Sequence, residues 1–378
     1  MRVGITGQAG FVGTHLYNTL ALYPDKFERI PFEDAFFQDE DKLKDFVQSC
    51  DAIVHLAAMN RHNDPEVLFQ TNIGLVKQLI AACEATLSTP HILFSSSTQE
   101  ERDNLYGKSK KEGRQLLGQW AERNFAKFTA FVIPNVFGPF GNPYYNSVVA
   151  TFCYQLTHNE QPKIEVDGEI KLIYVGELIN EIIEHIEAMQ SEASDDAIID
   201  TVHIQHTSQI KVSALLQKLT DYRQNYFEKG TIPSLNNTFD RNLFNTFLCY
   251  IDHTSFFPFK LKLNTDERGS FVETVKLNSG GQVSFSTTVP GITRGNHFHT
   301  RKAERFAVIK GKARIELRRI GTDQVLSFEL DGKEPAFVDM PVWFTHNITN
   351  TGKDELFTIF WINEHFDAND PDTYFEKV

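Results

Sequence analysis

The order of apolar and polar positions divides the chain into two regions of different texture. In the first region, short apolar runs alternate with stretches in which apolar residues recur every three or four positions, as on one face of a helix. The predicted strands are Arg2–Thr6, Asp51–Ala57 and Pro90–Ser95, and the predicted helices are Gly13–Leu22, Thr71–Glu84 and Tyr106–Phe125. Continuous apolar strands that alternate with helices indicate a parallel sheet, and therefore an α/β fold.

The second region begins near residue 255, where the helical spacing disappears. Short β-rich segments separated by Gly- and Pro-containing turns follow at Gly269–Lys276, Gln282–Thr288, Arg305–Lys310, Ala313–Arg319, Val325–Leu330 and Glu355–Trp361. Several short strands at regular spacing predict an antiparallel sandwich or barrel. We therefore expect two domains, an α/β domain over residues 1–245 and an all-β domain over residues 246–378.

A glycine motif lies between the first predicted strand and the first predicted helix. Its sequence is TGQAGFVG, from Thr6 to Gly13. Glycines at this place allow a tight turn and a close approach of the backbone to a pyrophosphate, which then lies at the helix N-terminus. The strand–turn–helix context favours a Rossmann-type dinucleotide site over an ordinary glycine-rich turn. The candidate cofactor contacts are Gly7, Gly10, Phe11, Val12 and Gly13.

The residue that selects the adenine ribose is expected about 20 residues beyond the glycines. Glu33 and Asp34 lie there, and a carboxylate would favour the free 2′-hydroxyl of NAD. Arg29 is the nearest base and would favour NADP if it turned toward the ribose. The residues leave the choice between NADPH and NADH open, with Glu33 as the first candidate contact.

The segment from Tyr106 to Lys110 carries a Tyr-x-x-x-Lys pattern. The i, i+4 spacing places both side chains on one face of a helix. A neighbouring ammonium is expected to lower the pKa of the phenol, which can then exchange a proton with a substrate oxygen. The stretch FSSST, from Phe94 to Thr98, ends a predicted strand just upstream, where an α/β sheet places its ligands, and a serine there can hydrogen-bond the same oxygen.

These stretches resemble the extended short-chain dehydrogenases/reductases, which act on nucleotide sugars, over roughly residues 1–180. The resemblance implies that Ser97, Tyr106 and Lys110 form the catalytic trio. It also implies that Tyr106 and Lys110 contact the cofactor, with Lys110 holding the nicotinamide ribose. It gives Asn72 a structural or a proton-relay role. The buried stretch DAIVHLAA adds three expected cofactor contacts, Asp51, Leu56 and Ala57. The segment between Ser97 and Tyr106 is short for this family, which implies a trimmed loop beside the site.

The all-β region contains a metal-ligand constellation. Residues 291–311 read G-x5-H-x-H-x4-E-x6-G, with His297, His299 and Glu304 as candidate ligands, and His346 lies downstream. On a strand, His-x-His directs both imidazoles to one face. Three imidazoles and a carboxylate suit Zn, Fe, Mn, Ni or Cu, and we expect one divalent ion, zinc first. The spacing resembles the two cupin motifs, which implies a jelly-roll barrel. Ligand spacing alone does not distinguish a structural metal ion from a catalytic one.

Composition excludes several classes of protein. The 378 residues carry 37 Lys and Arg against 50 Asp and Glu, a net charge of −13, which argues against nucleic-acid binding. Phosphate-bearing small molecules remain possible, because helix N-termini can hold them locally. The four cysteines form no close pair, and no apolar run approaches the roughly 20 residues of a membrane span. We expect a cytoplasmic protein that does not contact membranes.

Further stretches extend the resemblance over the whole chain, namely NSVVATFCYQ (146–155), PGITRGNHFH (290–299), THNI (345–348) and NDPDTYF (369–375). They resemble bifunctional enzymes of capsular polysaccharide synthesis in the UDP-N-acetyl-L-fucosamine pathway. That resemblance implies that the cupin half epimerises C3 of a UDP-linked 4-keto-6-deoxy-N-acetylhexosamine. The reductase half would then reduce the C4 ketone with NADPH.

Two alternative functions remain open at this point. One is a nucleotide-sugar 4-epimerase or dehydratase that keeps its cofactor bound. The other is a non-enzymatic sensor that binds a dinucleotide in one half and a small ligand in the other. Retention of Ser97, Tyr106 and Lys110 argues against the sensor, which has no use for a proton-transfer set. Extended reductases and cupins both tend to dimerise, so a homodimer is expected.

Overall fold

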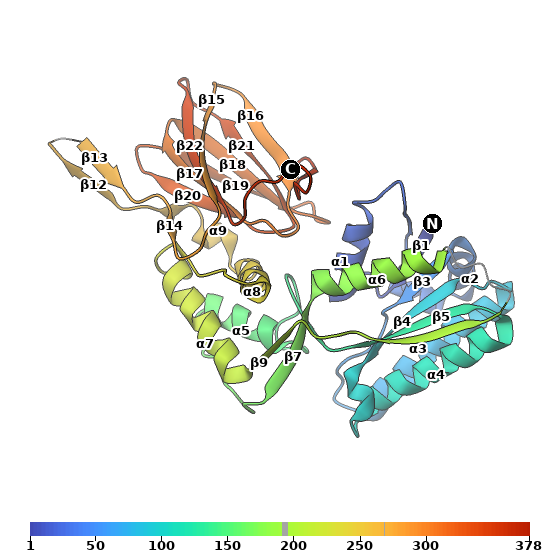
Figure 1. Ribbon diagram of the computed structural model, residues 1–378. Helices are drawn as coiled ribbons and strands as arrows, with labels where there is room; N and C mark the ends of the chain where they lie inside the picture. The colour runs from blue at the N-terminus through green and yellow to red at the C-terminus, as the bar shows by residue number, and fades with distance from the viewer. Residues whose placement is uncertain (191–195, 268) are drawn as a thin grey trace. The chain divides into compact units, whose positions relative to one another are not determined.

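A computed structural model describes residues 1–190, 196–267 and 269–378 (Figure 1). The chain forms two compact units. The α/β unit comprises Met1–Phe137, Tyr144–Ser147 and Glu169–Ile210, and the barrel unit comprises Gly138–Pro143, Val148–Gly168 and Lys211–Val378. This division differs from the expected boundary between 245 and 246, because helical residues from Lys211 onward group with the barrel. The assignment of one activity to each unit stays a prediction.

The α/β unit is built on a six-stranded parallel sheet with the strand order β2-β1-β3-β4-β5-β8. The strands are β1 (Arg2–Thr6), β2 (Glu28–Ile30), β3 (Ala52–His55), β4 (His91–Ser97), β5 (Lys127–Ile133) and β8 (Ile198–His203). The sheet confirms the α/β fold expected from the alternation of apolar runs and helices. All four residues of β3 are buried, as a central strand covered on both faces requires.

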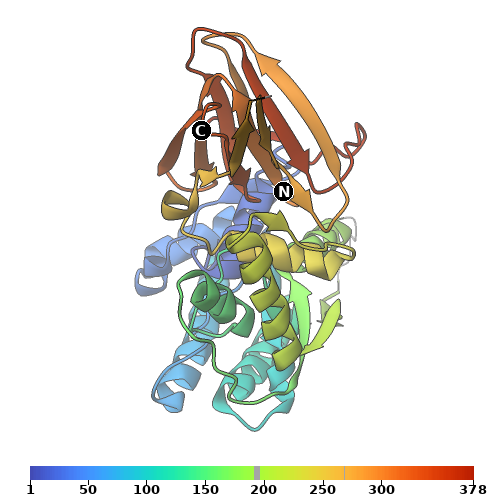
Figure 2. The same ribbon diagram turned by 90° about the vertical axis from the view of Figure 1, so that its left-hand side faces the viewer.

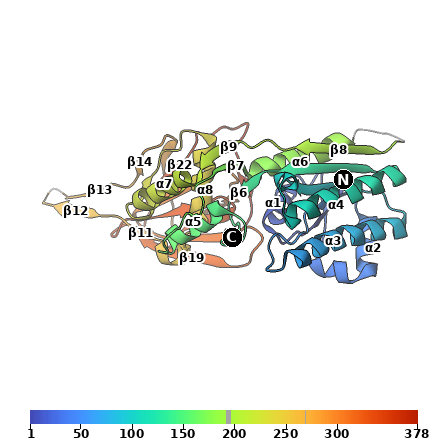
Figure 3. The ribbon, with the colours of Figure 1, turned by 90° about the horizontal axis from the view of Figure 1, so that it is seen from below.

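Helices cover both faces of this sheet. They are α1 (Phe11–Leu20), α2 (Glu40–Ser49), α3 (Pro65–Thr86), α4 (Leu105–Asn124) and α6 (Val175–Gln190). Helices α1 and α6 lie on one face, and α2, α3 and α4 lie side by side on the other (Figures 1 and 3). Helix α3 begins six residues before the expected start, because Asp64 caps it by accepting from the backbone of Glu66 and Pro65 occupies its first turn.

Short elements complete the two units. They are the 3₁₀ turns η1 (Asp34–Gln38) and η2 (Thr98–Glu101), and a three-stranded sheet of β6 (Asn135–Phe137), β7 (Glu169–Tyr174) and β9 (Ser208–Lys211). The barrel unit adds the pairs β10 (Thr231–Ile232) with β14 (Lys276–Leu277) and β12 (Leu263–Asp266) with β13 (Gly269–Val272). Among the residues described, no helix combines the length and the apolar character of a membrane span.

The barrel consists of two five-stranded sheets, drawn in orange and red in Figure 2. One has the order β11-β20-β17-β22-β15 and the other β19-β18-β21-β16-β23. Their bounds are β11 (Phe259–Lys260), β15 (Gln282–Thr288), β16 (Thr293–Phe298), β17 (Glu304–Lys310), β18 (Lys312–Arg319), β19 (Val325–Asp331), β20 (Ala336–Met340), β21 (Phe344–Asn350), β22 (Leu356–Ile362) and β23 (Tyr374–Phe375). Every strand pair in these sheets is antiparallel, which confirms the expected all-β jelly-roll domain.

The turn before β21 holds Trp343 where the cupin pattern usually has glycine. Its φ of 63° lies in the left-handed region that favours glycine. The turn still forms, because the backbone N–H of Trp343 donates to the carbonyl of His299 and its own carbonyl accepts from Ile320. A bulky residue therefore occupies a glycine position without loss of the barrel connection.

The helical part of the barrel unit comprises α5 (Val148–Thr157), α7 (Val212–Tyr222), the π-helical turn η3 (Arg223–Phe227), α8 (Thr238–Leu248) and α9 (His253–Phe256). A buried ionic network joins it to the strands. Arg305 of β17 pairs with both carboxylate oxygens of Asp339 and donates to the carbonyl of Gly230. The hydroxyl of Tyr226 donates to Asp339 at 2.6 Å. These bonds explain why residues before 246 fold with the barrel.

Candidate active site and metal centre

The glycine motif forms the turn between β1 and α1. Gly7 has a φ of +70°, and a Cβ on it would lie 2.8 Å from the backbone nitrogen of Ala57. A Cβ on Gly13 would lie 2.3 Å from the carbonyl oxygen of Gly7, so neither position accepts a larger residue. Gly10 precedes α1 without a side-chain cap, and the first turn of α1 carries no acidic residue. The amide groups at this helix start can therefore receive a pyrophosphate.

The structure brings several of the expected cofactor contacts together. Phe11 and Val12 form the first turn of α1, directly behind the glycine loop. Leu56 and Ala57 follow β3 at the same edge of the sheet, where the backbone N–H of Leu56 donates to the carbonyl of Thr6. Their backbone lies against Gly7, which supports their place in the predicted site.

Asp51 does not lie with these residues. It precedes β3, at the amino edge of the sheet, whereas the glycine loop lies at the carboxyl edge. Its carboxylate accepts from the guanidinium and from the backbone N–H of Arg2, each at 2.7 Å. The hydrogen bond from Arg2 lowers the pKa of Asp51. We therefore correct the expectation that Asp51 contacts the cofactor, because this position braces the start of the sheet.

The two candidates for contact with the adenine ribose lie at the end of β2, with Arg29 in the strand and Glu33 after it. Glu33 follows β2 and caps the start of η1 with an extended backbone. Arg29 stacks its guanidinium 4.1 Å from the centre of the Tyr17 ring and donates to the carbonyl of Tyr17. The base that would favour NADP is thus held by α1. The contact between Glu33 and a cofactor stays a prediction.

The expected catalytic trio comes from the end of β4 and the start of α4. Ser97 is the last residue of β4, and its hydroxyl accepts from the backbone N–H of Gln99 at 3.2 Å. Tyr106 and Lys110 lie one turn apart on α4, with the Lys110 Nζ 5.9 Å from the centre of the Tyr106 ring. Lys110 is 4% exposed and donates to the carbonyl of Ser95 at 2.9 Å, which ties α4 to the strand that carries Ser97.

Burial controls the protonation of this trio. It raises the pKa of Tyr106 to about 12 and lowers the pKa of Lys110 to about 8, although Glu100 acts on Lys110 in the opposite direction. The sequence pattern predicts a lowered pKa for Tyr106, but desolvation of the phenolate, together with the neighbouring Tyr145, raises it. Tyr106 is therefore a neutral phenol, which is the form that donates a proton.

Asn72 is fully engaged by its neighbours. Its amide accepts from the backbone N–H of Met59 at 2.7 Å, and it donates to the carbonyl of Met59 and to Ser109, both at 3.0 Å. These bonds join α3, α4 and the segment after β3. Of the two roles left open by the sequence, the structural one is supported by this arrangement.

One ion pair beside the trio is absent from the sequence prediction. Glu100, in η2, accepts from Arg114 of α4 at 2.7 Å and also accepts a short hydrogen bond from Ser96. Burial would raise the pKa of Glu100, but the bonds from Arg114 and Ser96 lower it. The trimmed segment between Ser97 and Tyr106 therefore forms a compact turn locked to α4. The only sequence signal for it is the shortness of that segment.

The four expected metal ligands converge inside the barrel. His297 lies in β16, His299 follows it, Glu304 begins β17 and His346 lies in β21. Their ligand atoms all lie within 4.8 Å of one another. The Oε2 atom of Glu304 is 3.8, 3.3 and 2.9 Å from the Nε2 atoms of His297, His299 and His346. The side chain of His297 is 25% exposed and marks the open side of the cluster.

The hydrogen bonds around this cluster fit a bound cation. The Nδ1 atoms of His299 and His346 face the carbonyls of Asp372 and Phe344, so they carry the protons. Both Nε2 lone pairs then face the carboxylate of Glu304, and the buried Nε2 of His299 has no hydrogen-bond partner. Acceptors held this close repel one another unless a proton or a metal ion lies between them.

The pKa shifts keep His346 neutral and Glu304 ionised, while burial lowers the pKa of His299 less than the neighbouring Glu304 and Asp372 together raise it. Burial lowers the pKa of His346, which keeps that imidazole neutral. Burial alone would raise the pKa of Glu304, but the three imidazoles around its carboxylate hold that pKa well below its usual range. A neutral imidazole and an ionised carboxylate are the forms that coordinate a metal.

Comparisons with known proteins agree with both units. Residues 3–198 match the NAD dependent epimerase/dehydratase family, and residues 264–374 match the polysaccharide biosynthesis C-terminal domain. The chain is 35% identical over 381 residues to the UDP-2-acetamido-2,6-beta-L-arabino-hexul-4-ose reductase of Pseudomonas aeruginosa, covering 99% of this chain and 98% of that protein.

Two solved structures are also similar. The capsular polysaccharide assembling protein CapF from Staphylococcus aureus shares 35% identity with a TM-score of 0.64, and 100% of both chains is covered. The structure of RMD from Pseudomonas aeruginosa complexed with NADPH is 21% identical, with a TM-score of 0.51 over 59% of this chain and 84% of that one, and shares the fold of the first unit. The resemblance expected from the sequence motifs is confirmed. The chain belongs to the NAD dependent epimerase/dehydratase family, in the group whose members continue into a polysaccharide biosynthesis C-terminal domain.

Proposed function

We propose that this protein is a bifunctional nucleotide-sugar enzyme of capsular polysaccharide synthesis. The barrel unit epimerises C3 of a UDP-linked 4-keto-6-deoxy-N-acetylhexosamine, and the α/β unit reduces the C4 ketone with NADPH. The observation that carries the proposal is that each unit contains its own group of chemically matched side chains. In the α/β unit the Nζ atom of Lys110 lies 5.9 Å from the centre of the Tyr106 ring, and in the barrel unit the ligand atoms of three histidines and Glu304 all lie within 4.8 Å of one another.

The order of the two steps follows from the chemistry of the sugar. A ketone at C4 acidifies the proton on C3, so epimerisation at C3 has to precede reduction. Once the ketone is reduced, that acidity is lost and the new configuration at C3 is fixed. A single chain that contains both activities can therefore make a product with two defined stereocentres.

In the α/β unit, the glycine loop and the start of α1 hold the pyrophosphate, and bound NADPH supplies the hydride. Tyr106, neutral in this structure, donates its proton to the C4 oxygen as negative charge develops there. Ser97 donates a hydrogen bond to the same oxygen, keeps its proton and orients the ketone. Lys110 keeps an ammonium beside Tyr106, where it favours the phenolate that forms after the proton leaves.

In the barrel unit, His297, His299, Glu304 and His346 would hold one divalent ion, with zinc as the first candidate. Such an ion supplies Lewis-acid stabilisation to the negative charge that develops on a ketone oxygen when the neighbouring carbon loses its proton. The partly exposed His297 gives the substrate an open side from which to reach the cluster. The ion is therefore proposed to be catalytic rather than only structural.

The identity of the cofactor and the oligomeric state belong to the same proposal. NADPH is proposed ahead of NADH, as the resemblance to the capsule-synthesis enzymes implies. A homodimer remains a prediction. The direct test is an absorbance assay at 340 nm with the UDP-linked 4-keto sugar, in which NADPH and NADH are compared.

Consumption of reduced cofactor with this ketone supports the proposal. Purified protein that holds its cofactor tightly and turns over without net oxidation would instead indicate a 4-epimerase or dehydratase. Binding of both ligands without turnover would indicate a sensor.

A further inference from the structure

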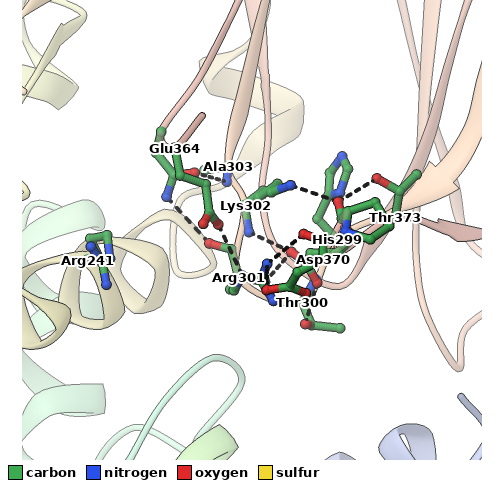
Figure 4. Close-up of polar contacts among 12 residues, drawn as sticks. Arg241, His299, Thr300, Arg301, Lys302, Ala303, Glu364, Asp370 and Thr373 are labelled. Atoms are coloured by element: carbon green, nitrogen blue, oxygen red, sulfur yellow. Dashed lines mark hydrogen bonds and ion pairs between the residues drawn. The ribbon is translucent and has the colours of Figure 1, made fainter. Parts of the chain in front are cut away.

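The segment Asn369–Phe375 packs against the loop that contains His299. Strand β23 extends this contact, since Phe375 and Tyr374 pair with His297 and Phe298 of β16. Figure 4 shows His299, Thr300, Arg301 and Lys302 facing the segment that carries Asp370 and Thr373. The sequence motif NDPDTYF therefore lies beside the metal cluster, although it supplies none of the four ligands.

The carboxylate of Asp372 accepts four hydrogen bonds from the loop that follows His299. Its Oδ1 accepts from the backbone N–H of Thr300 at 3.1 Å and from the Thr300 hydroxyl at 2.7 Å. Its Oδ2 accepts from the backbone N–H groups of Arg301 at 3.0 Å and Lys302 at 3.1 Å. The residue is 3% exposed, so these four bonds replace the water that a carboxylate otherwise requires.

The backbone of Asp372 acts on the metal ligand directly. Its carbonyl accepts the Nδ1 proton of His299, which leaves the Nε2 lone pair of that ring directed at Glu304. The side chain of Lys302 donates to the carbonyl of Pro371 at 2.7 Å and fixes the segment one residue before. Asp372 thus fixes the loop that follows His299 through its carboxylate, and it fixes the tautomer of the His299 ring through its carbonyl.

We propose that Asp372 is the positioning residue of the metal centre in the barrel unit. Its carboxylate fixes the loop of residues 300–302, and its carbonyl orients the imidazole of His299 for coordination. The inference rests on the proposed function, because it requires that the four-ligand cluster binds a metal ion. Residues that orient a metal ligand commonly change metal affinity 10- to 100-fold when they are substituted.

The test compares Asp372→Asn with the matched control Asp370→Asn. Asparagine has the same shape and tolerates the positive φ of 42° at this position, but it turns an NH₂ group toward backbone N–H donors. Asp370 lies in the same segment, and its 67% exposed side chain pairs with Arg301. Zn²⁺ affinity is measured by competition with a chromophoric chelator, and ligand geometry by the absorption spectrum of the Co²⁺-substituted protein.

We expect Asp372→Asn to weaken Zn²⁺ binding about 10- to 100-fold and to alter the Co²⁺ spectrum, because His299 loses its fixed orientation. Asp370→Asn should stay within about twofold of wild type, since exposed ion pairs contribute little. Far-UV circular dichroism checks that each variant is folded. If Asp372→Asn fails to fold, Thr300→Val, which removes only the hydroxyl bond to Asp372, should still weaken binding by about threefold.

The wild-type protein separates the two possible failures. If wild type binds no Zn²⁺, the proposed metal centre is wrong and the inference falls with it. If wild type binds Zn²⁺ and a folded Asp372→Asn, or Thr300→Val in its place, keeps the same affinity and the same Co²⁺ spectrum, the metal centre stands and the role of Asp372 is overturned.

Discussion

Replacement of Lys110 by methionine should make the α/β unit more stable and at the same time inactive as a reductase. Lys110 is 4% exposed, and burial lowers its pKa from 10.5 to about 8. A shift of this size corresponds to roughly 3 kcal/mol of folding free energy lost at neutral pH, where the buried amine has to carry a proton. Loss of the hydrogen bond to Ser95 offsets part of the gain, because a bond from a charged donor is worth about 1.5–3 kcal/mol.

The net expectation is a gain of roughly 1 kcal/mol for Lys110→Met at pH 7, with NADPH oxidation reduced at least about 100-fold. The pH dependence follows from the protons bound in each state. The unfolded chain keeps this proton up to a pH near 10.5 and the folded chain releases it near 8. The free energy of unfolding of the wild type therefore rises between about pH 8 and 10.5. Over this range the greater stability of Lys110→Met should disappear.

Urea unfolding with hydrogen-exchange labelling of β4 and α4 peptides measures this unit separately from the barrel. The matched control is Lys108→Met on the same helix, whose exposed side chain pairs with Asp103 and should change stability by less than about 0.5 kcal/mol. A Lys110→Met protein that is clearly less stable than wild type at pH 7, or whose relative stability does not vary between pH 7 and 10, would refute this reasoning.

Three further predictions concern other parts of the chain. Gly13→Ala should weaken NADPH binding at least about tenfold in a calorimetric titration, because a Cβ there would lie 2.3 Å from the carbonyl oxygen of Gly7; unchanged affinity would contradict the glycine-loop site. Arg305→Met should destabilise the barrel unit by about 3–5 kcal/mol in urea, because it leaves the buried carboxylate of Asp339 without its partner, and addition of Asp339→Asn should restore part of the loss. Glu304→Gln should lower the zinc content of purified protein while NADPH binding stays unchanged; a full complement of zinc would exclude this carboxylate as a ligand.

The features that the sequence predicted well are those set by short spacing. The glycine loop lies within one turn, Tyr106 and Lys110 lie four residues apart on one helix, and His297 and His299 lie two residues apart at the end of β16. Local periodicity decides on its own which side chains share a face in such motifs. The α/β unit and the barrel were predicted from the same kind of signal.

The features that the sequence did not predict depend on contacts between distant residues. The division at Lys211 reflects a buried network that joins Tyr226 and Arg305 to Asp339, and no local pattern indicates such pairing. Asp372 lies more than 70 residues after His299 in the chain, yet it contacts that ring. The prediction for Asp51 fails for another reason. Asp51 lies at the start of its strand, where it binds Arg2, whereas a parallel sheet binds ligands at the carboxyl ends of its strands.

The central claim is that one chain carries two activities at two separate sites, and Tyr106→Phe tests it most directly. The variant is incubated in D₂O with the UDP-linked 4-keto sugar and NADPH, while absorbance at 340 nm and deuterium incorporation at C3 are followed together. We predict that NADPH oxidation falls by about 100- to 10,000-fold, because the proton donor of the reduction is gone. Exchange at C3 should continue at the wild-type rate, because the barrel ligands are untouched. Loss of both signals in a folded variant, or retention of both, would contradict the account.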